Sequence, residues 1–172
     1  MIFFVSGRLD IFAEKNIMEH EKSLLSISHD HFHIMMVAQI IKKDSAAANG
    51  FLKNLDEKVK YAVHFFDQEL ANHFYLEEHI FQPLTKGISE EIDELLEKMK
   101  AEHKNIELLV RSLKNKTDLE NKLNLISSAL ENHIQLEERI LFPKIKESLS
   151  EEELEALAAK LNDKGYENIY KN

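Results

Sequence analysis

The sequence contains one short motif twice, and the motif carries side chains of the kind that bind metal ions. The two copies read NHFYLEEHI and NHIQLEERI, and each places a histidine four residues before a glutamate: His73 with Glu77, and His133 with Glu137. Because positions i and i+4 share one face of a helix, each copy directs an imidazole and a carboxylate the same way. Two near-identical pairs in one small chain predict a pair of metal ions held between helices.

A second repeat adds one histidine ahead of each motif. The segments DHFHIMMVAQII and EHKNIELLVRSL align without a gap, with His31 on His103, and both histidines follow an acidic residue. Steps of three, seven and ten residues from each of them meet only apolar side chains, which is typical of a core-facing helical stripe. His33 is the runner-up on the first helix, but its stripe is less regular and it falls on Asn105. The alignment therefore favours His31.

The elements that must position these residues are predicted to be helices. The 172 residues include only four glycines and two prolines, and strand-like alternation is absent. Turn and cap signals predict helices from Ser26 or Ser28 to about Lys43, from about Leu52 to Leu84, from Ser89 to about Lys114, and from Thr117 or Asp118 to about Ser148. Ser150 and the glutamates after it resemble a capping box, which predicts a short extra C-terminal helix over residues 150–162.

The expected arrangement of these helices brings the histidines together. Short connections favour antiparallel neighbours, so we expect an all-α, up-down-up-down four-helix bundle over about residues 26–147, in a single domain of residues 1–172. His73 and His103 both lie about 21–24 Å from the turn at Gly87, at a rise of about 1.5 Å per residue. Four histidines can then meet at one level. The predicted metal ligands are His31, His73, Glu77, His103, His133 and Glu137.

The side chains next to these ligands are expected to point elsewhere. Glu78 and Glu138 lie five residues after their histidines, so they are predicted to turn away, toward solvent or toward ion pairs on the helix surface. His79 also falls off the ligand face. These three residues are therefore predicted not to bind the metal.

The donors that the chain offers limit the chemistry of the site. Without cysteine there are no disulfides, thiolate zinc sites or iron–sulfur clusters, so nitrogen and oxygen must bind any metal. Imidazoles and carboxylates suit iron, manganese or zinc. Two glutamates from facing helices can each bridge two ions about 3.5–4 Å apart, with two histidines as terminal ligands on each ion. Such a site leaves open positions for water, oxide or a diatomic ligand.

Composition argues against several other functions. The net charge of -9 disfavours nucleic acid as a partner, and no apolar run approaches the length of a membrane span. The N-terminus lacks the features of a signal peptide, so a cytoplasmic location is expected. Neither Glu-x-x-His nor His-Glu-x-x-His occurs, which disfavours a ferritin-type ferroxidase and a zinc peptidase.

The ordered set of ligands resembles that of a known family. His31, His103 and the two His-x-x-x-Glu motifs resemble the hemerythrin-like family, the HHE cation-binding domain, over essentially the whole expected bundle. The aromatic residue and the proline that follow each motif are also similar to the family's pattern. The resemblance implies two non-haem iron ions as cofactor, with manganese or zinc as alternatives, and oxygen or another small diatomic molecule as the bound partner. It implies terminal histidines and bridging glutamates.

One position departs from the family's oxygen carriers. These place a second histidine one turn after the first on the third helix, where this chain has Glu107. Glu107 is thus an added ligand, an acceptor for an imidazole N–H, or an exposed residue. The remaining four-histidine, two-glutamate set is more similar to bacterial hemerythrin-like proteins linked to sensing, iron handling or repair of iron centres.

This departure shapes the expected function. We expect a protein that binds or senses oxygen, nitric oxide or peroxide, or that handles iron, rather than an enzyme. The alternatives are a di-iron oxidoreductase acting on the same molecules and a partner-binding module with a structural metal. The oligomeric state is open, with a homodimer as one option.

Overall fold

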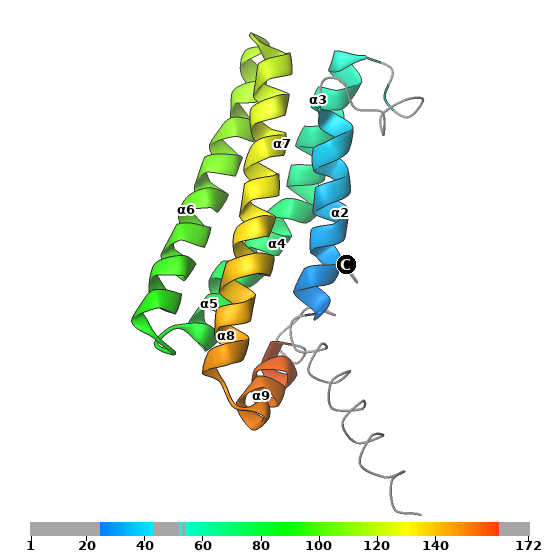
Figure 1. Cartoon of the computed structure of the whole chain (residues 1–172). Helices are drawn as coiled ribbons and strands as arrows, with labels where there is room; N and C mark the ends of the chain where they lie inside the picture. Colours follow the sequence, from blue (N-terminus) through cyan, green and yellow to red (C-terminus); the bar gives the residue numbers. More distant parts are fainter. Residues whose placement is uncertain (1–24, 43–51, 53, 162–172) are drawn as a thin grey trace, which may run out of the picture.

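The regular elements of this protein are helices. The computed structural model describes residues 25–42, 52 and 54–161, and every regular element within these ranges is helical (Figure 1). The all-α prediction is confirmed for this part of the chain. No helix in the described part is both long and apolar enough to cross a lipid bilayer.

Long helical segments lie side by side and form a bundle (Figure 1). The helices are α2 (Leu25–Ile41), α3 (Leu55–Phe65), α4 (Ala71–Leu76), α5 (Gln82–Thr85), α6 (Glu90–Ser112), α7 (Leu119–Leu136), α8 (Phe142–Ser148) and α9 (Glu151–Leu161). Helices α3 to α5 run on through the π-helical turns Phe66–Leu70 and Glu77–Phe81, and α7 runs into α8 through the π-helical turn Glu137–Leu141. Helix α7 packs against α2, α3 and α6, so it occupies a central place in the described contacts.

Polar side chains mark where several helices begin. Ser89 accepts a backbone N–H of the first turn of α6 at 3.2 Å and caps that helix, as predicted. Ser150 and Glu153 form the predicted capping box at the start of α9, with the N–H of Ser150 donating to Glu153 at 2.8 Å. Asn54, which the sequence did not single out, caps α3 in the same way at 3.0 Å. Local side-chain chemistry therefore sets these three starts.

Other predicted caps are wrong. Helix α2 already includes Leu25, so Ser26 and Ser28 lie within the helix rather than at the position before it. Asp118 stands at the start of α7, but its side chain accepts no backbone N–H from that helix and bonds instead to the side-chain amide of Asn121, at 3.1 Å. Lys116 and Asp118 instead adopt left-handed backbone conformations, with φ of 38° and 51°. The backbone itself makes this turn.

A polar layer divides the apolar core into two clusters. One cluster includes Ile34, Val37, Phe65, Leu70, Ile106, Val110, Leu123, Ile126 and Leu130. The other includes Ile27, Leu76, Phe81, Leu96, Met99, Leu136, Leu141 and, from α9, Leu157 and Leu161. The predicted ligands lie between the two, as His31 does between Ile27 and Ile34. Burial of apolar surface on both sides therefore stabilises the helices that hold the polar layer.

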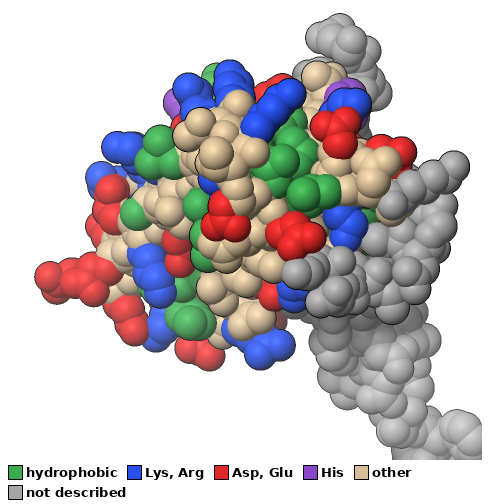
Figure 2. Space-filling model, turned by 90° about the horizontal axis from the view of Figure 1, so that it is seen from above, with side chains coloured by type: hydrophobic (Ala, Val, Ile, Leu, Met, Phe, Trp, Pro, Cys, Tyr) green, Lys and Arg blue, Asp and Glu red, His purple; other side chains and the backbone are tan. Residues whose placement is uncertain are grey.

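The outer surface carries charges of both signs. Figure 2 shows acidic and basic side chains intermixed on the face seen from above, with apolar side chains between them. This agrees with a composition of 31 acidic and 22 basic residues. On this face no block of one sign stands out, so the buried polar layer is the more informative feature.

Candidate metal centre

A widened turn begins at each glutamate of the repeated motif. The N–H of Gln82 donates to the carbonyl of Glu77, and the N–H of Phe142 to that of Glu137, each five residues back, so both turns are π-helical. Pro83 and Pro143, which follow these turns, lack a backbone N–H, so the ladder of helical hydrogen bonds is interrupted at each of them. Because π turns concentrate at functional sites, their recurrence in both repeats draws attention to the glutamates. A third π turn, Phe66–Leu70, has no counterpart in α7.

Glu77 lies between two pairs of histidines. Its Oε1 is 3.0 Å from Nε2 of His73 and 3.7 Å from Nε2 of His31. Its Oε2 is 3.1 Å from Nε2 of His103 and 3.9 Å from Nε2 of His133. One oxygen of a single carboxylate thus faces each pair, which is how a carboxylate that bridges two ions is arranged.

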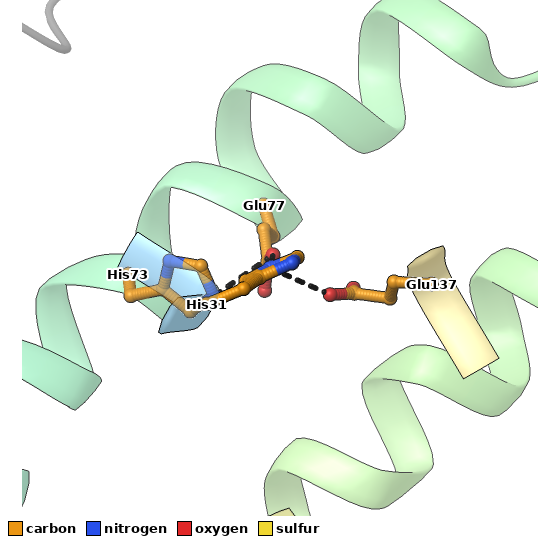
Figure 3. Close-up of side chains that lie close together, drawn as sticks. All are labelled: His31, His73, Glu77 and Glu137. Atoms are coloured by element: carbon orange, nitrogen blue, oxygen red, sulfur yellow. Dashed lines mark ion pairs between the residues drawn. The ribbon is translucent and has the colours of Figure 1, made fainter. Parts of the chain in front are cut away.

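Glu137 also contacts one histidine of each pair. Its Oε2 lies 3.1 Å from Nε2 of His31 and 3.7 Å from Nε2 of His133. Figure 3 shows Glu77 and Glu137 directed toward His31 and His73 from different segments of the chain. The six residues form two groups that share both glutamates, with one ligand atom from each residue within 4.8 Å of the others: His31, His73, Glu77 and Glu137; and Glu77, His103, His133 and Glu137.

The inward-facing atoms of this cluster are buried and lack hydrogen-bond partners. The six side chains belong to residues that are at most 2% exposed. No partner with hydrogen-bond geometry serves Nε2 of any of the four histidines or either oxygen of Glu77 and Glu137, although several of these atoms approach one another closely. Buried polar atoms without partners cost free energy, and such groups normally pair or bind metal. The donor set therefore fits a pair of metal ions that nitrogen and oxygen can coordinate.

Comparison with protein families gives a matching result. The family model described as the hemerythrin HHE cation-binding domain matches residues 27–145. The chain belongs to the hemerythrin HHE cation-binding family. A comparison with curated proteins and one with solved structures each return no match. Membership confirms the predicted family and assigns this hemerythrin domain to cation binding, which agrees with the clustered donors.

Two phenylalanine rings pack against the histidines of the six-residue cluster. Phe74 stacks on the ring of His103, with centroids 3.9 Å apart and planes 10° apart, and meets His133 edge to face at 5.4 Å. Phe142 stacks on His31 at 5.7 Å. These rings fix the imidazole orientations and replace water around them, which lowers the local dielectric constant.

The buried carboxylates raise the affinity of the histidines for protons. Burial alone would lower the pKa of His73, but Glu77 and Asp30 overcome it and raise that pKa to about 9. Burial likewise opposes the change at His31 and His103, yet their carboxylate neighbours raise the pKa of both. The pKa of Glu77 is held well below its usual range by the histidines, against the effect of burial. Metal binding must therefore displace protons from the cluster.

Each histidine of the hemerythrin cluster presents its other ring nitrogen to a carboxylate. The four Nδ1 distances are 2.6 Å from His31 to Glu138, 2.8 Å from His103 to Glu78, 3.4 Å from His133 to Glu102 and 3.6 Å from His73 to Asp30. An Nδ1–H that faces a carboxylate leaves Nε2 with its lone pair directed inward. At His31 and His103, where the contact has hydrogen-bond geometry, it favours the tautomer that a metal ligand requires, and the longer approaches at His73 and His133 have the same orientation.

The prediction that Glu78 and Glu138 turn away is wrong. Successive residues on a helix lie about 100° apart, so the residue after an inward-facing glutamate points toward the neighbouring helix of a bundle rather than to solvent. There Glu78 meets His103 of α6, and Glu138 meets His31 of α2. The doubled glutamate in each motif, and the acidic residue before His31 and His103, were the signals in the sequence.

The remaining candidates lie outside the cluster. His33, the runner-up to His31, is 42% exposed at its side chain and forms an ion pair with Glu69 at 2.9 Å. Glu107 pairs with Arg111 on the surface of α6. His79 is exposed and stacks on Tyr75. The structure thus gathers the six predicted residues and places His33 and Glu107 elsewhere.

Proposed function

We propose that this hemerythrin domain binds two non-haem iron ions and uses them to bind a small molecule such as oxygen, nitric oxide or peroxide. His31 and His73 would hold one ion, His103 and His133 the other, and the two glutamates would bridge them. The observation that carries the proposal is the set of buried, inward-facing nitrogen and oxygen atoms without partners. Iron bound there would supply open coordination positions and reversible one-electron chemistry.

The donor set supports iron without requiring it. Four imidazoles and two carboxylates suit iron, and the same donors accept manganese or zinc. The absence of cysteine removes the thiolate ligands that structural zinc sites often use. The metal content of the purified protein therefore decides between these ions.

The surroundings support a small ligand rather than a large one. The cluster is enclosed by phenylalanine rings and by the two apolar clusters, and a cavity of about 40 Å³ lies beside His73. A cavity of that size holds a few atoms. A wider groove of about 430 Å³ reaches His103 from the surface between α4 and α6. A diatomic molecule fits the small cavity, whereas the groove could take a larger molecule only on the surface side of His103, which is itself 2% exposed.

The proposed metal centre implies a particular arrangement of the helices around it. We infer that residues 1–172 form one domain whose long helical segments make an up-down-up-down four-helix bundle, with α9 as the extra helix. The contacts of α7 with α2 and α6 and the split core support this arrangement. The cytoplasmic location stays a prediction from the sequence.

Metal analysis of aerobically purified protein tests the proposal. We expect about two irons per chain, since the two groups of ligands each suit one ion. Glu77→Ala and Glu137→Ala should lose most of the iron and its near-ultraviolet absorption, whereas Glu107→Ala, on the surface of α6, should keep both. A full complement of manganese or zinc would overturn iron, and a metal-free wild-type protein of equal stability would overturn the site itself.

A further inference from the structure

The outer carboxylates connect the helices in a closed ring. Each long helical segment gives one carboxylate to a histidine of the next segment and receives one from the segment before it. Around the molecule, the pairs are Asp30 with His73, Glu78 with His103, Glu102 with His133, and Glu138 with His31. We call these four acidic residues the carboxylate ring. It begins on α2 and returns to α2, so each of the four histidines faces such a carboxylate. The contacts of His31 and His103 have hydrogen-bond geometry, whereas those of His73 and His133 are longer approaches without it.

The ring is built from two sequence devices, each used twice. Asp30 and Glu102 come directly before a histidine ligand, and Glu78 and Glu138 come directly after a bridging glutamate. The second pair makes the short contacts, at 2.8 and 2.6 Å, and the first pair the longer ones. Because both repeats contain both devices, the ring follows the internal symmetry of the inner ligands. This regularity indicates that the four carboxylate–histidine contacts form one arrangement and are not unrelated ion pairs.

The ring side chains lie at the edge of the buried region. Their exposed fractions are 23% for Asp30, 22% for Glu78, 25% for Glu102 and 36% for Glu138. Water reaches them, yet only an imidazole separates each from the metal position. Charges in such partly buried places are screened much less by salt than surface charges are. The ring therefore acts electrostatically on whatever ion the histidines hold.

The number of carboxylates around the site bears on the charge of the metal ions that it would hold. The inner glutamates and the ring together supply six negative charges, which match the six positive charges of two trivalent ions. Two divalent ions would leave the site with an excess of two negative charges. A carboxylate on the Nδ1–H also makes the imidazole a stronger electron donor, which favours the more highly charged ion.

We propose that the carboxylate ring selects trivalent over divalent metal at this centre and so sets which oxidation state of the bound pair is stable. This inference rests on the proposed di-metal function. It assigns to Asp30, Glu78, Glu102 and Glu138 a positioning and charge-setting role rather than a role as ligands. Glu78 and Glu138 should act most strongly, since a charge-assisted hydrogen bond to the imidazole is strongest at their short distances.

Competition between two ions that do not change oxidation state tests the inference directly. The ratio of gallium(III) affinity to zinc(II) affinity would be measured for the wild-type chain and for Glu78→Gln, Glu138→Gln, Asp30→Asn and Glu102→Gln. Substitutions next to metal-binding histidines commonly change metal affinity about 10–100-fold. We therefore expect Glu78→Gln and Glu138→Gln, which remove the two short contacts, to lower the gallium-to-zinc affinity ratio by a factor of about 10–100. Glu107→Gln, an equally conservative change on α6, should leave the ratio unchanged.

The same variants loaded with iron give a second measurement. The midpoint potential, followed by optical titration, should rise in Glu78→Gln and Glu138→Gln and stay at the wild-type value in Glu107→Gln. If the ring were only structural, both affinities would fall together and the ratio and potential would not move, which would overturn the inference while leaving the di-metal site intact. A wild-type chain that binds neither gallium nor zinc would overturn the proposed function and the inference with it.

Discussion

Protonation of His73 should make the stability of the metal-free protein depend on pH. After removal of metal by a chelator, its carboxylate neighbours raise the pKa of His73 from 6.5 to about 9 in the folded chain. A group whose folded-state pKa is raised adds stability below its unfolded pKa, and that contribution is lost as the pH rises through the folded value. The metal-free protein should therefore lose stability between about pH 6.5 and pH 9.

The size of the loss follows from the shift. At about 1.4 kcal/mol per pKa unit, His73 alone lowers the free energy of unfolding by roughly 3 kcal/mol across this window. For a domain of this length, that corresponds to a melting temperature about 6–12 °C lower. The raised pKa values of His31 and His103 act in the same direction. The metal-loaded protein should behave in the opposite way, because metal binding strengthens as the imidazoles lose their protons.

Calorimetry of chelator-treated and metal-loaded protein at pH 6.5, 7.5 and 9 provides the assay. Glu77→Gln is the matched control, since it removes the main partner of His73 and should flatten the pH dependence of the metal-free protein. Equal stability of the metal-free wild-type protein at pH 9 and at pH 6.5 would show that His73 is not held as a cation.

Three further substitutions test how the surrounding structure supports the site, and urea denaturation measures each of them. Phe74→Ala should cost about 3–5 kcal/mol and loosen metal binding, because the ring packs on His103; wild-type stability would contradict this packing role. Ser127→Ala should cost about 1 kcal/mol, because its buried hydroxyl donates to a carbonyl of α2 at 2.7 Å, whereas exposed Ser128→Ala should change stability by less than about 0.5 kcal/mol. Ser89→Ala should cost about 1 kcal/mol through loss of the α6 cap, and an unchanged midpoint would show that the cap does not stabilise the helix.

The inner cluster could be predicted because its information lies along single helices. The i, i+4 spacing of His73 and Glu77, repeated at His133 and Glu137, fixes a shared face without any knowledge of the neighbours. Capping at Ser89 and Ser150 is local in the same sense, since the bonded groups lie within three residues. The repeat then carried the same argument to His31.

The outer carboxylates could not be predicted in this way. Whether Glu78 meets solvent or a histidine depends on which helix lies about 100° around from the core face, and spacing along one helix does not contain that information. Ser28 shows the same limit: the local pattern predicts a cap, but its hydroxyl donates to Glu138, 110 residues away. The π turns at Glu77 and Glu137 could not be predicted either, because hydrophobic periodicity does not distinguish one widened turn from a regular helix.

The sharing of the two glutamates links the halves of the chain. The first ligand group takes His31, His73 and Glu77 from residues 25–85, but its fourth member, Glu137, comes from the other half; the second group takes Glu77 across in return. Neither half holds a complete set by itself. Bound ions would therefore fasten the halves to each other, so that neither could open without releasing metal. Local opening of either half and release of the ions would then be a single cooperative event, so the exchange of bound metal would be limited by how often one of the halves opens.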